Sequence, residues 1–162
     1  MIVIGLGGNM PDGQGHAPIM VLRAAVEALR TLPGLRLRLL SPFYATAPLP
    51  PSGQPPYVNA VASLEGCAEP ARLLSWLQSI EARAGRVRGR PNAARTLDLD
   101  IVAMHNCVRD EPDPVLPHPR LHERAFVLRP LADIAPGWMH PRLGRTIGDL
   151  LARLPPQEIT RL

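Results

Sequence analysis

The chain has 162 residues, of which 46% are hydrophobic and 20% are charged, and its formal net charge is +4. This length and apolar content predict a single domain over residues 1–162 with a sizeable core, and they exclude a disordered chain. The positive surplus indicates a polyanionic partner, either a nucleic acid or a nucleotide, unless it only follows the composition of the genome.

Hydrophobic periodicity predicts alternating strands and helices in the first two thirds of the chain. In chain order we expect a strand over residues 2–6, a helix over 18–32, a strand over 35–46, a strand over 57–64, a helix over 70–84 and a strand over 97–104. This β-α-β-β-α-β order is typical of the ferredoxin-like α+β fold, in which two helices pack on one face of an antiparallel sheet.

The residues from 106 onward are expected to form a C-terminal extension, with helix in part of 120–131 and over 147–154. Cys67 and Cys107 are too few for a disulfide framework, which favours a reducing, cytoplasmic location. The apolar run at the N-terminus is too short for a signal peptide or a membrane span. We therefore expect no membrane partner.

Two aspartates stand on one face of the last predicted strand. Asp98 and Asp100 alternate with apolar residues, so their α-carbons lie roughly 6–7 Å apart and their side chains point the same way. Neighbouring carboxylates repel each other, and aspartate is disfavoured in strands. Either a divalent cation such as Mg²⁺ offsets this cost, or the acidic face belongs to an edge strand and is solvated.

An arginine-rich segment leads into the acidic strand. Every basic residue of the chain other than histidine is an arginine, which excludes Schiff-base and P-loop lysine chemistry. Four of them lie within ten residues: Arg86, Arg88, Arg90 and Arg95. A generic basic loop is one interpretation, but guanidinium groups beside paired aspartates favour the binding and transfer of phosphate.

The glycine-rich segment 5–9 does not have dinucleotide-binding spacing. The G-x-G-x-x-G pattern would require glycine where Met10 stands, so a tight turn at a strand end is favoured. Tyr57 and Asn59 share a strand face, and an aromatic ring beside an amide is suited to a flat heterocycle, although core packing is the alternative. His118, between two prolines, is either a phosphate contact or solvent-facing, and its neighbours do not form a zinc ligand set.

Several segments together resemble one family, 6-hydroxymethyl-7,8-dihydropterin pyrophosphokinase of folate biosynthesis. They occur in family order and span most of the chain: GLGGN at 5–9, YATAPL at 44–49, QPPYVNA at 54–60, GRVR at 85–88, RTLDLD at 95–100 and PHPRLHERAFVL at 117–128. The resemblance implies a ferredoxin-like core and an ATP-dependent enzyme that transfers pyrophosphate to the pterin hydroxymethyl group and releases AMP.

The resemblance also implies roles for individual residues. Asp98 and Asp100 match positions that hold two Mg²⁺ ions, and they are the expected catalytic residues together with Arg86 and Arg95. The positions that match ATP contacts are Glu81 near the adenosine, and Arg86, Arg88, Arg95, His118 and Arg124 at the phosphates. The positions that match pterin contacts are Thr46, Leu49, Tyr57, Asn59 and Phe126. Ala94 departs from the usual proline of the family, and the role of Arg88 and Arg90 stays open.

Two other function classes compete with the enzyme. A ferredoxin-like nucleic-acid-binding module is compatible with the basic charge, but it displays aromatic residues on central strands. Here the fourth strand, which we expect to be central, carries aspartates, so no nucleic-acid partner is expected. The third candidate is a protein that binds pterin without turnover. We expect ATP and the hydroxymethyl dihydropterin as partners of a monomer.

Overall fold

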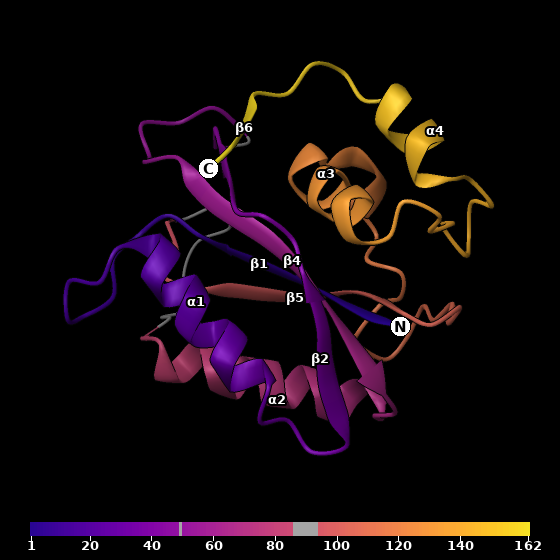
Figure 1. The fold of residues 1–162 in the computed structure, drawn as a ribbon, viewed down its shortest axis with the longest axis horizontal. Coiled ribbons are helices and arrows are strands. Elements are labelled where there is room, and N and C mark those ends of the chain that lie inside the picture. Colours follow the sequence, from indigo (N-terminus) through magenta and orange to yellow (C-terminus); the bar gives the residue numbers. More distant parts are fainter. Residues whose placement is uncertain (49, 86–93) are drawn as a thin grey trace.

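The computed structural model of the protein describes residues 1–48, 50–85 and 94–162. The described strands are β1 (Ile2–Gly8), β2 (Leu35–Leu40), β3 (Tyr44–Thr46), β4 (Tyr57–Gly66), β5 (Asp98–Met104) and β6 (Ile159–Arg161). The described helices are α1 (Pro18–Leu29), α2 (Pro70–Arg83), the short 3₁₀ helix η1 (Leu121–Glu123), α3 (Ala125–Ile134) and α4 (Ile147–Ala152). Figure 1 shows their arrangement.

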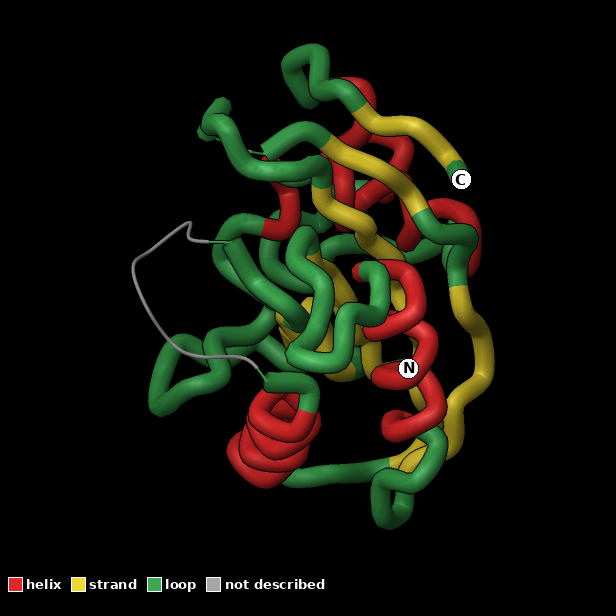
Figure 2. The backbone as a smooth tube through the Cα atoms, turned by 90° about the vertical axis from the view of Figure 1, so that its left-hand side faces the viewer, coloured by secondary structure: helices red, strands yellow, loops and turns green. Residues whose placement is uncertain are grey.

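The strands form one sheet in the order β5-β1-β4-β3-β6, and β2 also pairs with β4. Every one of these pairings is antiparallel. Helices α1 and α2 lie on one face of the sheet, and α3 and α4 lie on the other (Figures 1 and 2). The prediction of an α+β fold with an antiparallel sheet is confirmed, but helices cover both faces rather than one.

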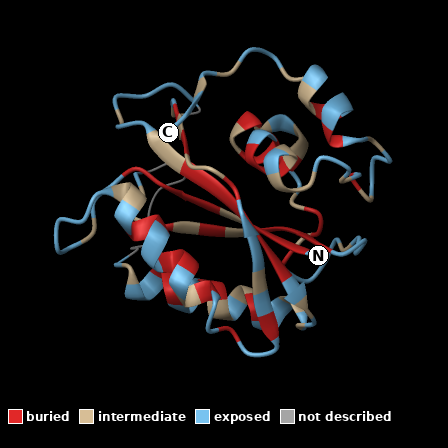
Figure 3. Cartoon of the chain, in the orientation of Figure 1, coloured by how far each residue is buried: buried red, intermediate tan, exposed pale blue. Residues whose placement is uncertain are grey.

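Because side chains alternate between the two faces along each strand, the sheet contributes to two separate hydrophobic cores. On β1, Ile2 and Ile4 pack with α1 and α2, whereas Val3 packs with α3 and α4. Both faces of the central strands are therefore buried (Figure 3), which explains why β1 reads as a continuous apolar run rather than an alternating one. The same alternation on β5 puts Leu99 toward α1 and α2, and Val102 toward α3. Asp98 and Asp100 are four and two residues before Val102, so their side chains point to the same face of the sheet, which α3 covers.

The predicted strand over residues 35–46 is divided into β2 and β3. The division comes at Ser41 and Pro42, because proline has no N–H for the ladder. Ser41 replaces the missing pairing: its Oγ accepts from the Val61 N–H at 2.9 Å, and its own N–H donates to the Val61 carbonyl at 2.9 Å. Both β2 and β3 pair with β4, and β3 also pairs with β6.

The acidic strand β5 stands at one end of the sheet and pairs with β1 among the described residues. Our expectation that it is central was wrong. Strand β6 was not predicted, and the predicted helix over 18–32 ends at Leu29. No helix among the described residues is long and apolar enough to cross a membrane.

Candidate active site

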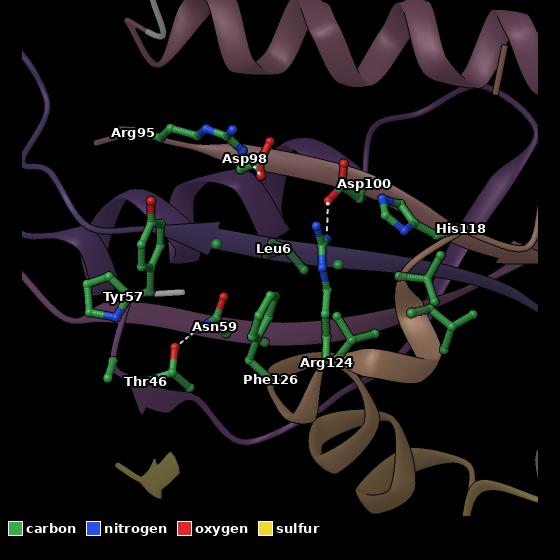
Figure 4. Close-up of a pocket in the computed structure, with 18 of the residues that line it drawn as sticks. Leu6, Thr46, Tyr57, Asn59, Arg95, Asp98, Asp100, His118, Arg124 and Phe126 are labelled. Atoms are coloured by element: carbon green, nitrogen blue, oxygen red, sulfur yellow. Dashed lines mark hydrogen bonds and ion pairs between the residues drawn. The ribbon is translucent and has the colours of Figure 1, made fainter. Parts of the chain in front are cut away.

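A pocket opens on the α3 face of the sheet, where β1, β4 and β5 meet the segment that leads into α3 (Figure 4). It is polar on the β5 side and aromatic on the β4 side. Most of the residues named as site candidates from the sequence line it: Thr46, Tyr57, Asn59, Arg95, Asp98, Asp100, His118, Arg124 and Phe126. Leu49, Arg86 and Arg88 lie outside the described residues.

The two aspartates open into this pocket from β5. Their side chains are 20% exposed for Asp98 and 39% exposed for Asp100. Arg95 Nη1 lies 2.6 Å from Asp98 Oδ2, and Arg124 Nη1 lies 4.0 Å from Asp100 Oδ2. Each carboxylate therefore faces a guanidinium group, which reduces the repulsion between the two acids.

The donor set of this acidic pair suits Mg²⁺. Mg²⁺ is usually held by one or two carboxylates and completed by water and substrate phosphates. Among the described residues there is no cluster of three or more histidine, cysteine, aspartate or glutamate side chains that could hold a metal ion. A pair of oxygen ligands on one strand face therefore fits a cation that arrives with a phosphate substrate better than a closed structural zinc site.

His118 and Arg124 form the basic edge of the pocket. Burial, together with the neighbouring Arg124 cation, lowers the pKa of His118 to about 4, so the imidazole is neutral at pH 7. Its Nδ1 accepts from the Arg120 backbone N–H at 3.1 Å, which leaves the proton on Nε2. Burial lowers the pKa of Arg124, and Asp100 opposes this effect. The edge thus carries one neutral donor and one fixed cation.

The opposite end of the pocket combines two aromatic rings with a buried amide. Tyr57 comes from β4 and Phe126 from the first turn of α3, and both rings project into the pocket (Figure 4). Asn59 lies between them in this view and is only 5% exposed. Its Nδ2 donates to Thr46 Oγ1 at 2.7 Å, which fixes the orientation of the amide. This end suits a flat, polar-edged ring.

Gly7 and Gly8, where the sequence favoured a tight turn, instead belong to the end of β1 and pair with β4. Close approach of other segments explains why they are glycines. A Cβ atom added to Gly7 would lie 2.8 Å from Asn59 Oδ1, and one added to Gly8 would lie 2.5 Å from the Thr96 carbonyl oxygen. Both distances are shorter than normal contacts. The glycines therefore leave room for the pocket amide and for the segment that leads into β5.

Asn9 has a positioning role that the sequence analysis missed. It is 2% exposed, and its side chain joins two distant segments. Its Oδ1 accepts from the Arg95 backbone N–H at 2.9 Å, and its Nδ2 donates to Gln54 Oε1 and to the Pro55 carbonyl, each at 3.1 Å. The only signal in the sequence was an asparagine directly after a glycine turn, and such a residue is also common in ordinary turns.

A second hollow lies beside the first, on the side of β5 that faces α2. It is lined by Glu81 from α2, and it shares five residues with the first pocket: Arg95, Asp98, Asp100, His118 and Arg124. Glu81 is 4% exposed. The acidic pair therefore lines both hollows.

Residues 3–136 match the family described as 7,8-dihydro-6-hydroxymethylpterin-pyrophosphokinase (HPPK). The chain belongs to the HPPK family. It is 42% identical over 161 residues to a 2-amino-4-hydroxy-6-hydroxymethyldihydropteridine pyrophosphokinase of Pseudomonas aeruginosa, covering 99% of this chain and 96% of the relative. It is 38% identical over 159 residues to the protein of the same description in Haemophilus influenzae, covering 98% of this chain and 96% of that relative. The resemblance inferred from the motifs is confirmed.

The fold agrees with a solved structure that contains HPPK. The crystal structure of Plasmodium falciparum HPPK-DHPS wild type has a TM-score of 0.66 and 14% identity, covering 94% of this chain and 44% of that chain. At this identity the likeness shows the fold alone. It supports the antiparallel sheet and its packed helices, which form the frame of the pocket described above.

Proposed function

We propose that this chain transfers pyrophosphate from ATP to the hydroxymethyl group of 6-hydroxymethyl-7,8-dihydropterin and releases AMP, in tetrahydrofolate biosynthesis. Membership of the HPPK family supports this reaction. The observation that carries it is one pocket lined by Asp98 and Asp100 on one side and by Tyr57, Asn59 and Phe126 on the other. Groups suited to phosphate chemistry and groups suited to a flat heterocycle thus line the same cavity.

The aromatic end of the pocket is the proposed pterin site. Tyr57 and Phe126 would hold the two faces of the ring, because aromatic side chains stack on flat heterocycles. Asn59, held by Thr46, would read the polar edge, since an amide both donates and accepts hydrogen bonds. Leu49, outside the described residues, stays a proposed backbone contact.

The basic edge and the second hollow are the proposed ATP site. Arg95 and Arg124 would contact the phosphates as fixed cations, and neutral His118 would donate from Nε2. Glu81, buried in the second hollow, would lie near the adenosine. Arg86 and Arg88, outside the described residues, stay proposed phosphate contacts. Arg86 also stays a proposed catalytic residue, together with Arg95 and the two aspartates.

Asp98 and Asp100 are the proposed ligands of two Mg²⁺ ions. Bound with ATP, the ions would neutralise phosphate charge. The reaction forms a bond between the pterin hydroxyl oxygen and the β-phosphorus of ATP. It breaks the bond between that phosphorus and the α–β bridging oxygen, which leaves with AMP, while the hydroxyl proton passes to solvent. The contribution of the side chains is to align the two substrates and to stabilise the charge that develops on the phosphates.

We further propose that residues 1–162 are one pyrophosphokinase domain with a ferredoxin-like core and a C-terminal extension. The strand order and the antiparallel pairing support such a core. We also propose a monomer that acts in the cytoplasm, without nucleic acid or membrane. The exposed, unbridged Cys67 and Cys107 are consistent with a reducing compartment.

Product analysis tests the proposed reaction. Incubation with ATP, Mg²⁺ and the hydroxymethyl dihydropterin should yield AMP and pterin pyrophosphate in equal amounts, measured by phosphorus NMR. Formation of ADP instead of AMP, or AMP release that does not depend on pterin, would contradict it.

A further inference from the structure

The side chain of Gln157 bridges the backbone on either side of Arg124. Gln157 lies just before β6, far along the chain from α3. Its Oε1 accepts from the Ala125 N–H at 2.9 Å, and its Nε2 donates to the Glu123 carbonyl at 2.9 Å. Both functional groups of one amide are thus used on the two residues that flank Arg124.

This bridge acts as an N-terminal cap supplied from another part of the chain. The first N–H groups of a helix have no partner within the helix. Arg124 occupies the cap position of α3 with extended φ and ψ angles, and its own side chain makes no capping hydrogen bond. Gln157 supplies the acceptor that a guanidinium group, which has only donors, cannot provide.

The residues held by this bridge belong to both ends of the pocket. Arg124 lies 4.0 Å from Asp100, and its guanidinium carbon lies 5.4 Å from the centre of the Phe126 ring. Phe126 follows directly after Ala125, whose N–H is the one that Gln157 binds. A rotation of this first turn of α3 would therefore move the ring and the guanidinium group together.

The segment after Gln157 is fastened to the other wall of the pocket. Strand β6 pairs with β3, and Ile159 lies opposite Thr46. Thr46 in turn holds the Asn59 amide. The last six residues thus connect the wall that carries Phe126 to the wall that carries Thr46, and Gln157 is the point of attachment on the α3 side.

We propose that Gln157 is a positioning residue for pterin binding, which acts through Arg124 and Phe126 and does not touch the substrate. The inference rests on the proposed function, because it assumes that Phe126 stacks on the pterin. It assigns to the C-terminal segment a part in setting the width of the pocket as well as a part in completing the sheet.

Three variants of the full chain separate positioning from general stability. Gln157→Met keeps the length of the side chain and removes both hydrogen bonds. Gln157→Glu keeps an acceptor for the Ala125 N–H, which is favourable at a helix N-terminus, but loses the donor to the Glu123 carbonyl. Thr160→Val is the matched control, because Thr160 is exposed on the same C-terminal segment and valine suits a strand.

Two readouts are needed, both at a temperature where every variant is folded. Pterin affinity is measured by calorimetry in the presence of a non-hydrolysable ATP analogue. Gln157→Met should weaken it about tenfold, Gln157→Glu by less, and Thr160→Val not at all, because small displacements of a binding group are costly. Exchange of the Ala125 amide hydrogen, followed by NMR without substrate, should be faster in Gln157→Met than in the unmodified chain.

The outcomes distinguish this inference from the proposed function. If the unmodified chain binds pterin and Gln157→Met binds it equally well, the inference is overturned and the proposed function stands. Equal losses in Gln157→Met and Thr160→Val would also overturn it, since they would indicate a general effect of the segment. If the unmodified chain binds no pterin, the proposed function fails and the inference falls with it.

Discussion

The Arg95 guanidinium donates a hydrogen bond to the Asp98 carboxylate, with 2.6 Å between Nη1 and Oδ2. Both side chains are partly buried, at 30% and 20% exposed, in the same pocket. In the proposed reaction Arg95 contacts phosphate and Asp98 contacts a cation. Binding of ATP with Mg²⁺ would therefore replace this ion pair by two others, one between Arg95 and phosphate and one between Asp98 and Mg²⁺. Both side chains would keep a partner of opposite charge.

Replacement of Arg95 by alanine is expected to lower kcat by about 100- to 1000-fold, because one cation that stabilises the transferring phosphate is lost. The free energy of unfolding should fall by no more than about 1 kcal/mol, since partly exposed ion pairs contribute little. Steady-state kinetics and thermal unfolding measure the two effects. Arg36→Ala, at an exposed position on β2, is the control, and similar kinetics for both variants would refute a phosphate role for Arg95.

Loss of the Phe126 ring should act on pterin rather than on ATP. We expect Phe126→Ala to raise the KM for pterin by about tenfold or more, because stacking area is lost. The KM for ATP should change much less. Phe126→Tyr keeps the ring, so its KM for pterin should stay close to that of the unmodified chain. An equal rise in both KM values for Phe126→Ala would argue against a ring-stacking role.

Gly7 offers a test of the packing around the pocket amide. A Cβ atom at this position would meet Asn59 Oδ1 at 2.8 Å, so Gly7→Ala should displace the amide and destabilise the fold by about 1–3 kcal/mol. Pterin affinity should fall as well. Gly13→Ala is the matched control, because no atom lies within 4 Å of its added Cβ. Unchanged pterin binding in Gly7→Ala would show that the amide does not read the ring.

His118 should make stability depend on pH. Its pKa is lowered from 6.5 to about 4 in the folded chain, chiefly by burial, so the unfolded chain binds more protons between these two values. The stabilising effect of the neutral imidazole is complete above about pH 6.5 and is lost as the pH falls toward 4, by up to about 3 kcal/mol.

The measurement for His118 is chemical unfolding at pH 7 and pH 4. We compare the unmodified chain with His118→Gln, which cannot titrate in this range. The contributions of other titrating groups to the free energy of unfolding then cancel in the difference. The unmodified chain should lose more stability on acidification than the variant does. Equal losses would mean that His118 is not held neutral by its surroundings.

Periodicity predicted the elements whose residues pack against a continuous core. It placed β1, β4, α1 and α2 to within a few residues, because their apolar spacing follows directly from burial on one helix face or in the sheet. It failed over residues 35–46, where Pro42 interrupts an apolar pattern that otherwise continues. It also missed β6, a three-residue strand that is held by backbone pairing with β3 rather than by an apolar face.

The site shows the same division between local and long-range information. The shared face of Asp98 and Asp100 followed from strand geometry alone, since residues two apart point the same way. The roles of Asn9 and Gln157 did not, because each acts by hydrogen bonds to backbone far away in the sequence. No local pattern marks such partners, and only the folded chain brings them together.

The central claim is that the acidic pair on β5 supports pyrophosphate transfer to pterin, and Asp98→Asn tests it most directly. The variant keeps the shape of the side chain and removes the charge that a Mg²⁺ ligand requires. Pterin-dependent AMP release from ATP is measured over a range of Mg²⁺ concentrations, with circular dichroism to confirm folding. We predict about a 1000-fold loss of turnover in a folded variant, at the upper end of the range that one electrostatic group contributes. Near-normal AMP release at the same Mg²⁺ concentration would contradict the account.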